Sequence, residues 1–380
     1  MSSDPVYLGF AVSQLHPDAL LRQYFPSKIG GSPAWLSAEL PSGDELKCKH
    51  CGDNMRFLAQ IYAPMRELDT DRAFHRTLFL FACAKATCLL KKSAVVLRSQ
   101  LPLRNEFFDE EAPDFPDADL EEAVEFDDVS RDSLQIPDFD FIEYPQFDIS
   151  TEEDETVVPS ITEVAQEEDS KRSGISKLTP EERAQANEAL RQYTEAMKDQ
   201  NSDVRQITVE ELEQYENRSR NDDMEFERFQ RVVKHHPEQV LRYQPGGVAL
   251  WAGSSDKASV NENDRSDAAL QEAREDAEEE KNDESNAFVQ VPVCSLCGAD
   301  RQFEFQLMPT FMSVVGVGFA PNDMDFGTIA VYTCSQSCDI GNKYVTEYAH
   351  VQRPSAPLGA DLLAALAQMP AHLMQQAPQA

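Results

Sequence analysis

The sequence predicts an α+β, β-rich protein in which two duplicated small β lobes are joined by acidic disordered linkers and short helices. Three observations predict this fold class. Eight cysteines fall into two sets of four that lie far apart in the chain. The residues beside the two sets match at equal offsets. Long stretches rich in Asp and Glu separate the cysteine-bearing segments.

The cysteines form two quartets, and each begins with a C-x-x-C pair. The first quartet is Cys48, Cys51, Cys83 and Cys88, and the second quartet is Cys294, Cys297, Cys334 and Cys338. A C-x-x-C turn lets two thiolates approach one metal ion, and a second pair completes a tetrahedral shell with no position for water. We therefore expect up to two structural zinc ions. Two alternatives remain, namely buried apolar cysteines and a redox pair, and His50 or His75 can replace a thiolate.

The two quartets are embedded in matching sequence. One glycine, one phenylalanine and one glutamine recur at the same distance after each C-x-x-C, and an apolar run recurs before each third cysteine. The matched residues are Gly52 and Gly298, Phe57 and Phe303, Gln60 and Gln306, and 77–81 and 328–332. This match predicts an ancient duplication whose two lobes pack about a pseudo-twofold axis.

The composition divides the chain into six segments. Strand patterns at 6–10, 57–62, 77–81 and 94–101 indicate a folded N-terminal lobe. The expected order is an N-terminal lobe, an acidic disordered linker, a helical segment packed on the C-terminal lobe, a second acidic linker, the C-terminal lobe and a flexible tail. Their bounds are 4–104, 105–175, 176–253, 254–287, 288–354 and 355–380.

The first linker carries most of the charge of the chain. Residues 106–170 hold 25 acidic residues against one basic residue, Arg131, a net charge of −24 within a total of −34. Like charges at this density repel one another and oppose compact folding. Eight aromatic residues are spread through the same stretch, which favours folding upon binding over an inert spacer.

Helical signals follow this linker. Thr179-Pro-Glu-Glu182 is a capping box that predicts a helix to about Met197, and 208–211 repeats the signature. Phe226, Phe229 and Val233 recur at helical spacing, and the pattern is expected to continue through 237–243. The tail carries a Leu/Met stripe at 362–369, which is either frayed or a helix that binds a partner.

Charge and motifs limit the function classes. A net charge of −34 opposes binding to nucleic acid and to anionic membranes. It suits a basic protein partner, or it serves solubility alone. We find no secretory signal, no membrane-spanning run and no nucleotide-binding or hydrolase motif. The expectation is a soluble, non-enzymatic protein of the cytoplasm, with the nucleus as a second location.

Several segments together resemble the programmed cell death protein 2 family. The likeness covers both folded segments in order and lies in 6–10, 28–36, 48–64, 74–83, 237–243 and 292–297. The acidic linkers carry no family signature. Animal members often insert a zinc-finger module of the MYND type, and no such cysteine cluster is present. The chain is therefore similar to the simpler form, like the yeast factor named for accumulation of 20S ribosomal RNA.

This resemblance implies a dedicated chaperone. Family members capture a newly made, basic small-subunit ribosomal protein of the S-five class and protect it until the 40S subunit assembles. We expect a monomer that binds one client without contacting nucleic acid. The alternative is a zinc-dependent scaffold in transcriptional or cell-death signalling, with an enzyme as a distant third.

The client-binding surface is expected in the cleft between the lobes and along the acidic stretch. Trp35 and Trp251 are candidate anchors, although both equally suit a packing role in the core. The acidic candidates are Glu110, Glu111, Asp127, Asp128, Glu152, Glu153, Asp154 and Glu155.

Overall fold

A computed structural model of the chain describes its two cysteine-bearing segments and the strands between them. The described residues are 5–13, 20–65, 71–105, 107–108, 134–137, 139–154, 156, 158–160, 163–164, 179–181, 183–188, 191, 224–254, 257–259, 289–318 and 322–354. The predictions for 109–133, for a helix at 208–211, for most of the second linker and for the tail lie outside these residues.

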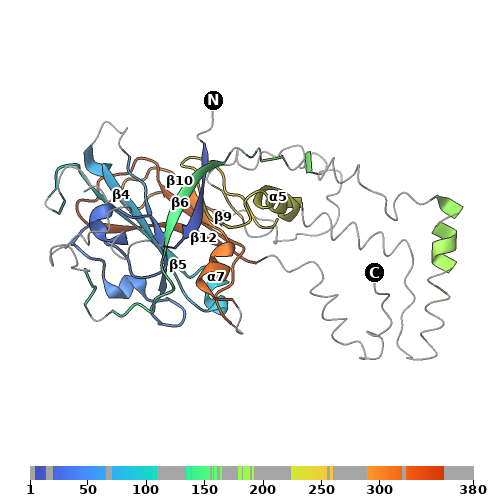
Figure 1. Cartoon of the computed structure of the whole chain (residues 1–380), viewed down its shortest axis with the longest axis horizontal. Coiled ribbons are helices and arrows are strands. Elements are labelled where there is room, and N and C mark those ends of the chain that lie inside the picture. Colours follow the sequence, from blue (N-terminus) through green and yellow to red (C-terminus); the bar gives the residue numbers. More distant parts are fainter. Residues whose placement is uncertain are drawn as a thin grey trace, which may run out of the picture.

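Ten strands form one closed barrel (Figure 1). Around the barrel the order is β1, β6, β2, β3, β4, β5, β12, β11, β10 and β7, which returns to β1. Their bounds are β1 Val6–Val12, β2 Lys28–Ile29, β3 Arg56–Tyr62, β4 His75–Ala82, β5 Ala94–Leu101, β6 Phe147–Asp154, β7 Gln239–Tyr243, β10 Arg301–Leu307, β11 Thr328–Cys334 and β12 Tyr344–Gln352. A separate parallel pair joins β8 (Ala258–Ser259) to β9 (Val289–Gln290).

Two antiparallel meanders supply six of the ten strands. We call β3–β4–β5 with the first quartet the first unit, and β10–β11–β12 with the second quartet the second unit. The four strands predicted in the first segment are confirmed. Each unit has a register shift at the matched place, between Phe57 and Ala59 in one and between Phe303 and Phe305 in the other. A common ancestry of the units stays a prediction.

The units are not separate lobes with a cleft between them. Strands β5 and β12 are hydrogen-bonded antiparallel neighbours, with Tyr344 opposite Ser99. On the far side of the barrel, β1 pairs with both β6 and β7. Gly9 of β1 is needed there, because a Cβ atom would lie 2.8 Å from Ile149 and 2.9 Å from Leu241. Closure removes the free edges that each meander would expose alone.

Strand β6 corrects the prediction of a disordered linker over 105–175. Residues 148–154 pair with β1, and residues 147–148 pair with β2. The charge density of the segment suggested an unfolded chain. In this strand Ile149 and the side chain of Asp154 are buried. The carboxylates of Glu152 and Glu153 face solvent, so their mutual repulsion is screened by water.

The barrel interior and its outer face carry different cores. Residues of β4 alternate, so that Leu78 and Leu80 pack inside while Phe79 and Phe81 pack outside. The outer cluster of the first unit also includes Trp35, Ile136 and Phe139. A smaller outer cluster on the second unit surrounds Trp251. Both tryptophans are thus buried, with exposed fractions of 1% and 5%.

Three helices lie at the edge of the barrel: α1 (Ala86–Leu89), α5 (Met224–Val233) and α7 (Thr310–Val315). Helix α5 lies beside the barrel (Figure 1). It packs through Phe229 and Val232 against Leu250 and Met308. Short 3-10 turns form at Arg22–Tyr24, Gly43–Leu46 and Asp71–Ala73. Among the described helices, none has the length and hydrophobicity needed to span a bilayer.

The helical prediction for 237–243 is wrong. This segment forms β7, which lies between β1 and β10. Pro237 separates it from α5, and Val240 and Leu241 are both buried although they are adjacent. Tertiary pairing therefore overrides the periodicity that suggested a helix.

Candidate metal centres

Each quartet converges on one point. Within a quartet, all four sulfur atoms lie within 4.8 Å of one another. The Sγ–Sγ distance is 3.7 Å for Cys51 and Cys83, 3.8 Å for Cys294 and Cys338, and 3.5 Å for Cys297 and Cys334. Four thiolates at a Zn–S distance of about 2.3 Å would be roughly 3.8 Å apart. The donor sets therefore fit one tetrahedral metal ion each.

The two C-x-x-C turns have the same backbone. In the first, the Cys48 amide donates to Asp53 O at 2.8 Å and the Gly52 amide donates to Cys48 O at 2.8 Å. In the second, Cys294 and Gly298 make the corresponding bonds at 2.8 Å and 2.9 Å. Both glycines have positive φ, +78° and +74°, and no atom lies within 4 Å of where a Cβ would be. Glycine is required there by conformation, not by space.

Each turn also supports a thiolate on its first cysteine. Burial raises the pKa of Cys48, but the Ser93 hydroxyl and the amides of Cys51 and His50 more than offset this and lower it to about 6. Burial acts in the same way on Cys294, and the amides of Cys297 and Leu296 lower its pKa to about 7. Deprotonated sulfur is the form that binds a metal ion.

The second half of each quartet is held by the opposite unit. Arg72, before β4, donates to Ser337 O at 2.9 Å and to Gln336 O at 2.8 Å, between Cys334 and Cys338. In return, the Asn322 carbonyl and side chain accept the amides of Ala86 and Thr87, both at 3.1 Å, between Cys83 and Cys88. Neither ligand loop is therefore supported by its own unit alone.

The surroundings of the quartets differ. Near the first, Ser93 Oγ lies 3.0 Å from Cys48 Sγ, and an exposed Lys85–Asp53 ion pair spans 2.7 Å. Near the second lies a buried network in which Glu347 binds Arg98 and Arg301, each at 2.7 Å. We did not predict this network from the sequence, because nothing in the alternating pattern of 94–101 sets Arg98 apart from a surface arginine.

The two tryptophans occupy matched places. Trp35 follows Ala34, whose amide donates to Gln60 Oε1 at 2.8 Å. Trp251 follows Leu250, whose amide donates to Gln306 Oε1 at 2.6 Å. The matched glutamines thus fix the loops that carry the tryptophans into the outer clusters. This arrangement accounts for both rings as packing residues, and a client-binding role for them stays a prediction.

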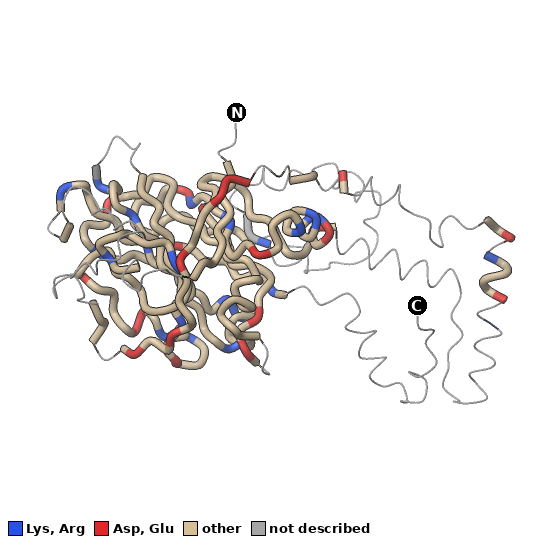
Figure 2. Tube along the Cα trace, viewed as in Figure 1, with Lys and Arg blue, Asp and Glu red and all other residues tan. Residues whose placement is uncertain are grey.

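The acidic candidates separate into three groups. Glu152 and Glu153 are exposed on β6, where acidic residues cluster in Figure 2. Asp154 is instead paired with Arg242 at 2.9 Å, and both side chains are buried. The third group lies outside the described residues and comprises Glu110, Glu111, Asp127, Asp128 and Glu155.

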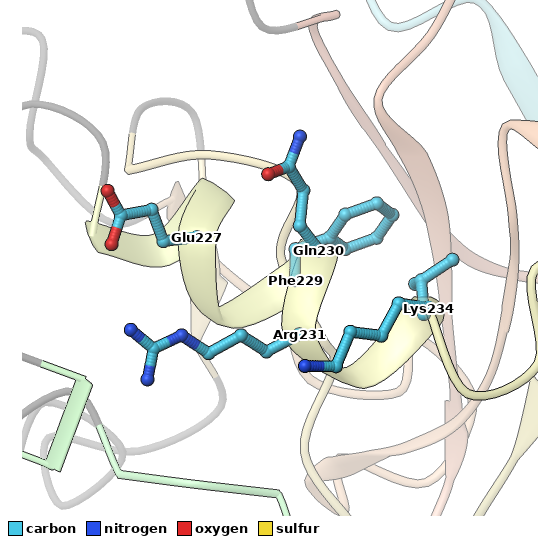
Figure 3. A pocket seen from close by; sticks show the side chains of 6 residues that line it. Glu227, Phe229, Gln230, Arg231 and Lys234 are labelled. Carbon is cyan, nitrogen blue, oxygen red and sulfur yellow. The ribbon is translucent and has the colours of Figure 1, made fainter. Parts of the chain in front are cut away.

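A surface hollow of about 580 Å³ runs along α5 (Figure 3). Its lining residues all belong to this helix and the residue that follows it, so the hollow has a wall on one side only. Arg231 and Lys234 extend in the same direction, away from Gln230. The polar groups diverge, unlike those of a catalytic pocket, in which they converge on one point.

Two family models match the chain. Residues 5–115 match the programmed cell death protein 2 N-terminal domain, and residues 223–353 match the programmed cell death protein 2 C-terminal putative domain. Each matched region contains one quartet. Together the two models span the barrel, apart from β6.

Curated relatives extend over most of the chain. Programmed cell death protein 2 of Mus musculus is 28% identical over 395 residues, which cover 92% of this chain and 96% of that protein. Programmed cell death protein 2-like of Homo sapiens is 25% identical and covers 88% and 91%. The probable 20S rRNA accumulation protein 4 of Schizosaccharomyces pombe is 31% identical over 129 residues, which cover 34% and 27%. No solved structure matches the chain.

Proposed function

The chain belongs to the programmed cell death protein 2 family, and on this premise we propose that it is a dedicated chaperone for ribosome assembly. Its client is a newly made, basic small-subunit ribosomal protein of the S-five class. It binds one copy of this client and protects it during biogenesis of the 40S subunit. The proposed site of action is the cytoplasm, and no enzymatic step is involved.

The observation that carries this proposal is the strong negative charge of a chain that has a relative named for ribosomal RNA accumulation. One relative is named for the accumulation of 20S rRNA, which supports a connection to ribosome biogenesis. The chain has a net charge of −34, and 24 of these negative charges arise within residues 106–170. A basic protein that binds RNA needs a negatively charged partner before it reaches the RNA. Negative charge on the chaperone also raises the rate at which the two proteins associate.

Zinc is the metal proposed for the two quartets. Soft thiolate donors in a closed tetrahedral set favour zinc and leave no open position for chemistry. The quartets would hold the ends of the meanders in place, so the metal serves the shape of the barrel and not the capture of a client. Elemental analysis of the purified chain is expected to find two equivalents of zinc. A value far below two contradicts this part of the proposal.

Affinity purification from growing cells tests the chaperone proposal. One basic ribosomal protein should be recovered in nearly equal amount, and blocking translation should deplete it if capture occurs on the nascent chain. Recovery of several unrelated partners without that protein would favour the second candidate, a zinc-dependent scaffold. The one observation that favours this alternative is that the acidic stretch resembles a transcriptional activation region.

The acidic stretch gives a kinetic test. Deletion of 109–133 leaves β6 and the packed Phe107 and Phe108 in place and should slow client association at low salt, because long-range attraction between opposite charges is lost. The difference from the intact chain should shrink as salt is raised. Equal association rates at low salt would contradict a role for this stretch in capture.

A further inference from the structure

Arg98 connects the first unit to the second quartet. It lies on β5, has an exposed fraction of 0%, and donates through Nη2 to Cys338 Sγ at 3.5 Å and through Nη1 to Cys338 O at 3.2 Å. Gln100, two residues on, donates to Ser337 O at 3.2 Å and to Cys338 O at 3.1 Å. The fourth ligand of the second quartet is therefore held by side chains of the first unit.

The charge around this contact is positive. Glu347 accepts from Arg98 Nε and from Arg301 Nε, each at 2.7 Å, so two guanidinium groups face one carboxylate. All three side chains are buried: the exposed fraction is 0% for Arg98, 7% for Arg301 and 1% for Glu347. Four thiolates around one divalent ion carry a net charge of two minus. A buried excess cation that donates to one of these sulfurs stabilises such a centre.

The matched position beside the first quartet carries no cation. Thr77 pairs with Ser99, and the matched Thr328 pairs with Gln352, so Arg98 in β5 corresponds to Val351 in β12. Val351 packs in the interior core. In the first quartet, Cys48 Sγ instead lies 3.0 Å from the neutral Ser93 hydroxyl. The contact to Cys338 is thus specific to one quartet and does not follow from the matched backbone.

We propose that Arg98 is a positioning residue for the metal site of the second quartet. Its guanidinium orients Cys338 and offsets the charge of the tetrathiolate centre, so that the second site is completed by the first unit. This inference rests on the proposal that both quartets bind metal.

Cadmium NMR of the full chain separates the two sites. Cadmium replaces zinc in tetrathiolate sites, and the wild-type chain should give two signals. R98M should shift or broaden one signal and leave the other unchanged. With zinc bound, one of two equivalents should become easier for a chelator to remove, by about 10–100-fold in affinity.

Two further variants distinguish positioning from stability. R242M removes another buried guanidinium, which binds Asp154 and Gln239 and neither ligand loop, and both cadmium signals should stay in place. R98Q removes the charge of Arg98 but keeps an N–H donor, and Glu347 stays paired with Arg301, so R98Q should unfold at a higher temperature than R98M and still shift one signal. If R98M destabilises the fold, R98Q carries the test.

Three outcomes would overturn the inference. R98M and R98Q could leave both signals and both zinc affinities unchanged, or they could disturb both sites equally. In either case the metal proposal stands and only the role of Arg98 fails. A wild-type chain that shows no signal from the second quartet would instead remove the metal site itself, and this inference with it.

Discussion

The first and second units share a backbone plan but differ in what fills the barrel beside them. Both units have three strands and one cysteine quartet. In both, the pairing register shifts within the first of these strands, which is β3 in one unit and β10 in the other. At the shifted position the first unit places Leu58 in the apolar core, whereas the second places Glu304, paired with Arg76 from the first unit. Matched hydrogen bonding therefore fixes where the sulfurs lie, while side-chain identity decides how the interior charge is balanced.

The largest expected effect comes from breaking one quartet and following the other. Cys83→Ser and Cys334→Ser each remove a proposed zinc ligand that is 1% exposed. Structural zinc contributes about 10–16 kcal/mol in small domains, more than the usual stability of a protein, so either change should unfold the barrel. Because β5 and β12 are directly paired, both units should lose hydrogen-exchange protection together. Protection retained in the untouched unit would show that the units fold independently.

A pair of buried cations gives the next effect. Lys28 pairs with Gln60 across β2 and β3, and Arg242 pairs with the matched Gln306 across β7 and β10. Arg242 binds buried Asp154, so R242M should cost about 3–5 kcal/mol in the free energy of unfolding. Lys28 instead binds the neutral Gln146 amide oxygen, at 3.0 Å, so K28M should stabilise the fold at neutral pH by about 1–3 kcal/mol. Urea denaturation measures both values.

The pH dependence of unfolding checks the assignment to Lys28. Burial, only partly offset by Glu143, lowers its pKa from 10.5 to about 8. Between these values the unfolded chain binds more protons than the folded chain, so stability should rise with pH across that window. K28M should remove this rise, and its advantage over the wild type should vanish above the window. A gain that persists at high pH would point to packing instead.

The matched glutamines should have similar effects if the units are alike in backbone. Gln60 and Gln306 each accept the amide that precedes a tryptophan, and each donates to a backbone carbonyl at 2.9 Å. Q60A and Q306A should each cost about 1–3 kcal/mol, because the partners are left unsatisfied in a buried place. Thermal unfolding, with tryptophan fluorescence as the probe, measures both. A large difference would mean that only one loop depends on its glutamine.

The smallest effects are expected at the glycines of the C-x-x-C turns. G52A and G298A place a Cβ in open space at a positive φ, so each should cost about 1–2 kcal/mol from backbone strain alone. G52N and G298N should cost less, because asparagine tolerates this conformation better. Equal losses of unfolding free energy in the two turns would confirm that their backbones are equivalent. Alanine variants as stable as the wild type would contradict the strain.

The quartets were predictable because metal-ligand spacing and glycine placement are local properties of sequence. So were the strands of the first segment, whose apolar runs are long and bounded by turn residues. Segments 147–154 and 237–243 were assigned wrongly because each becomes a strand only by pairing with neighbours distant in the chain. Arg98 and Glu304 could not be recognised, because a charged residue in a strand looks like a solvent-facing one until the opposite wall of the barrel is in place.

By itself, the sequence determined two cysteine quartets, the matched residues around them, the acidic character of the chain and its family. Only the tertiary structure decided that the two units share one barrel, that β6 and β7 help to close it, and that each quartet is supported from the opposite unit. The physical reason is range. Turn geometry and ligand spacing are set within a few residues, whereas strand pairing and buried charge are settled between residues more than a hundred positions apart, which no local pattern records.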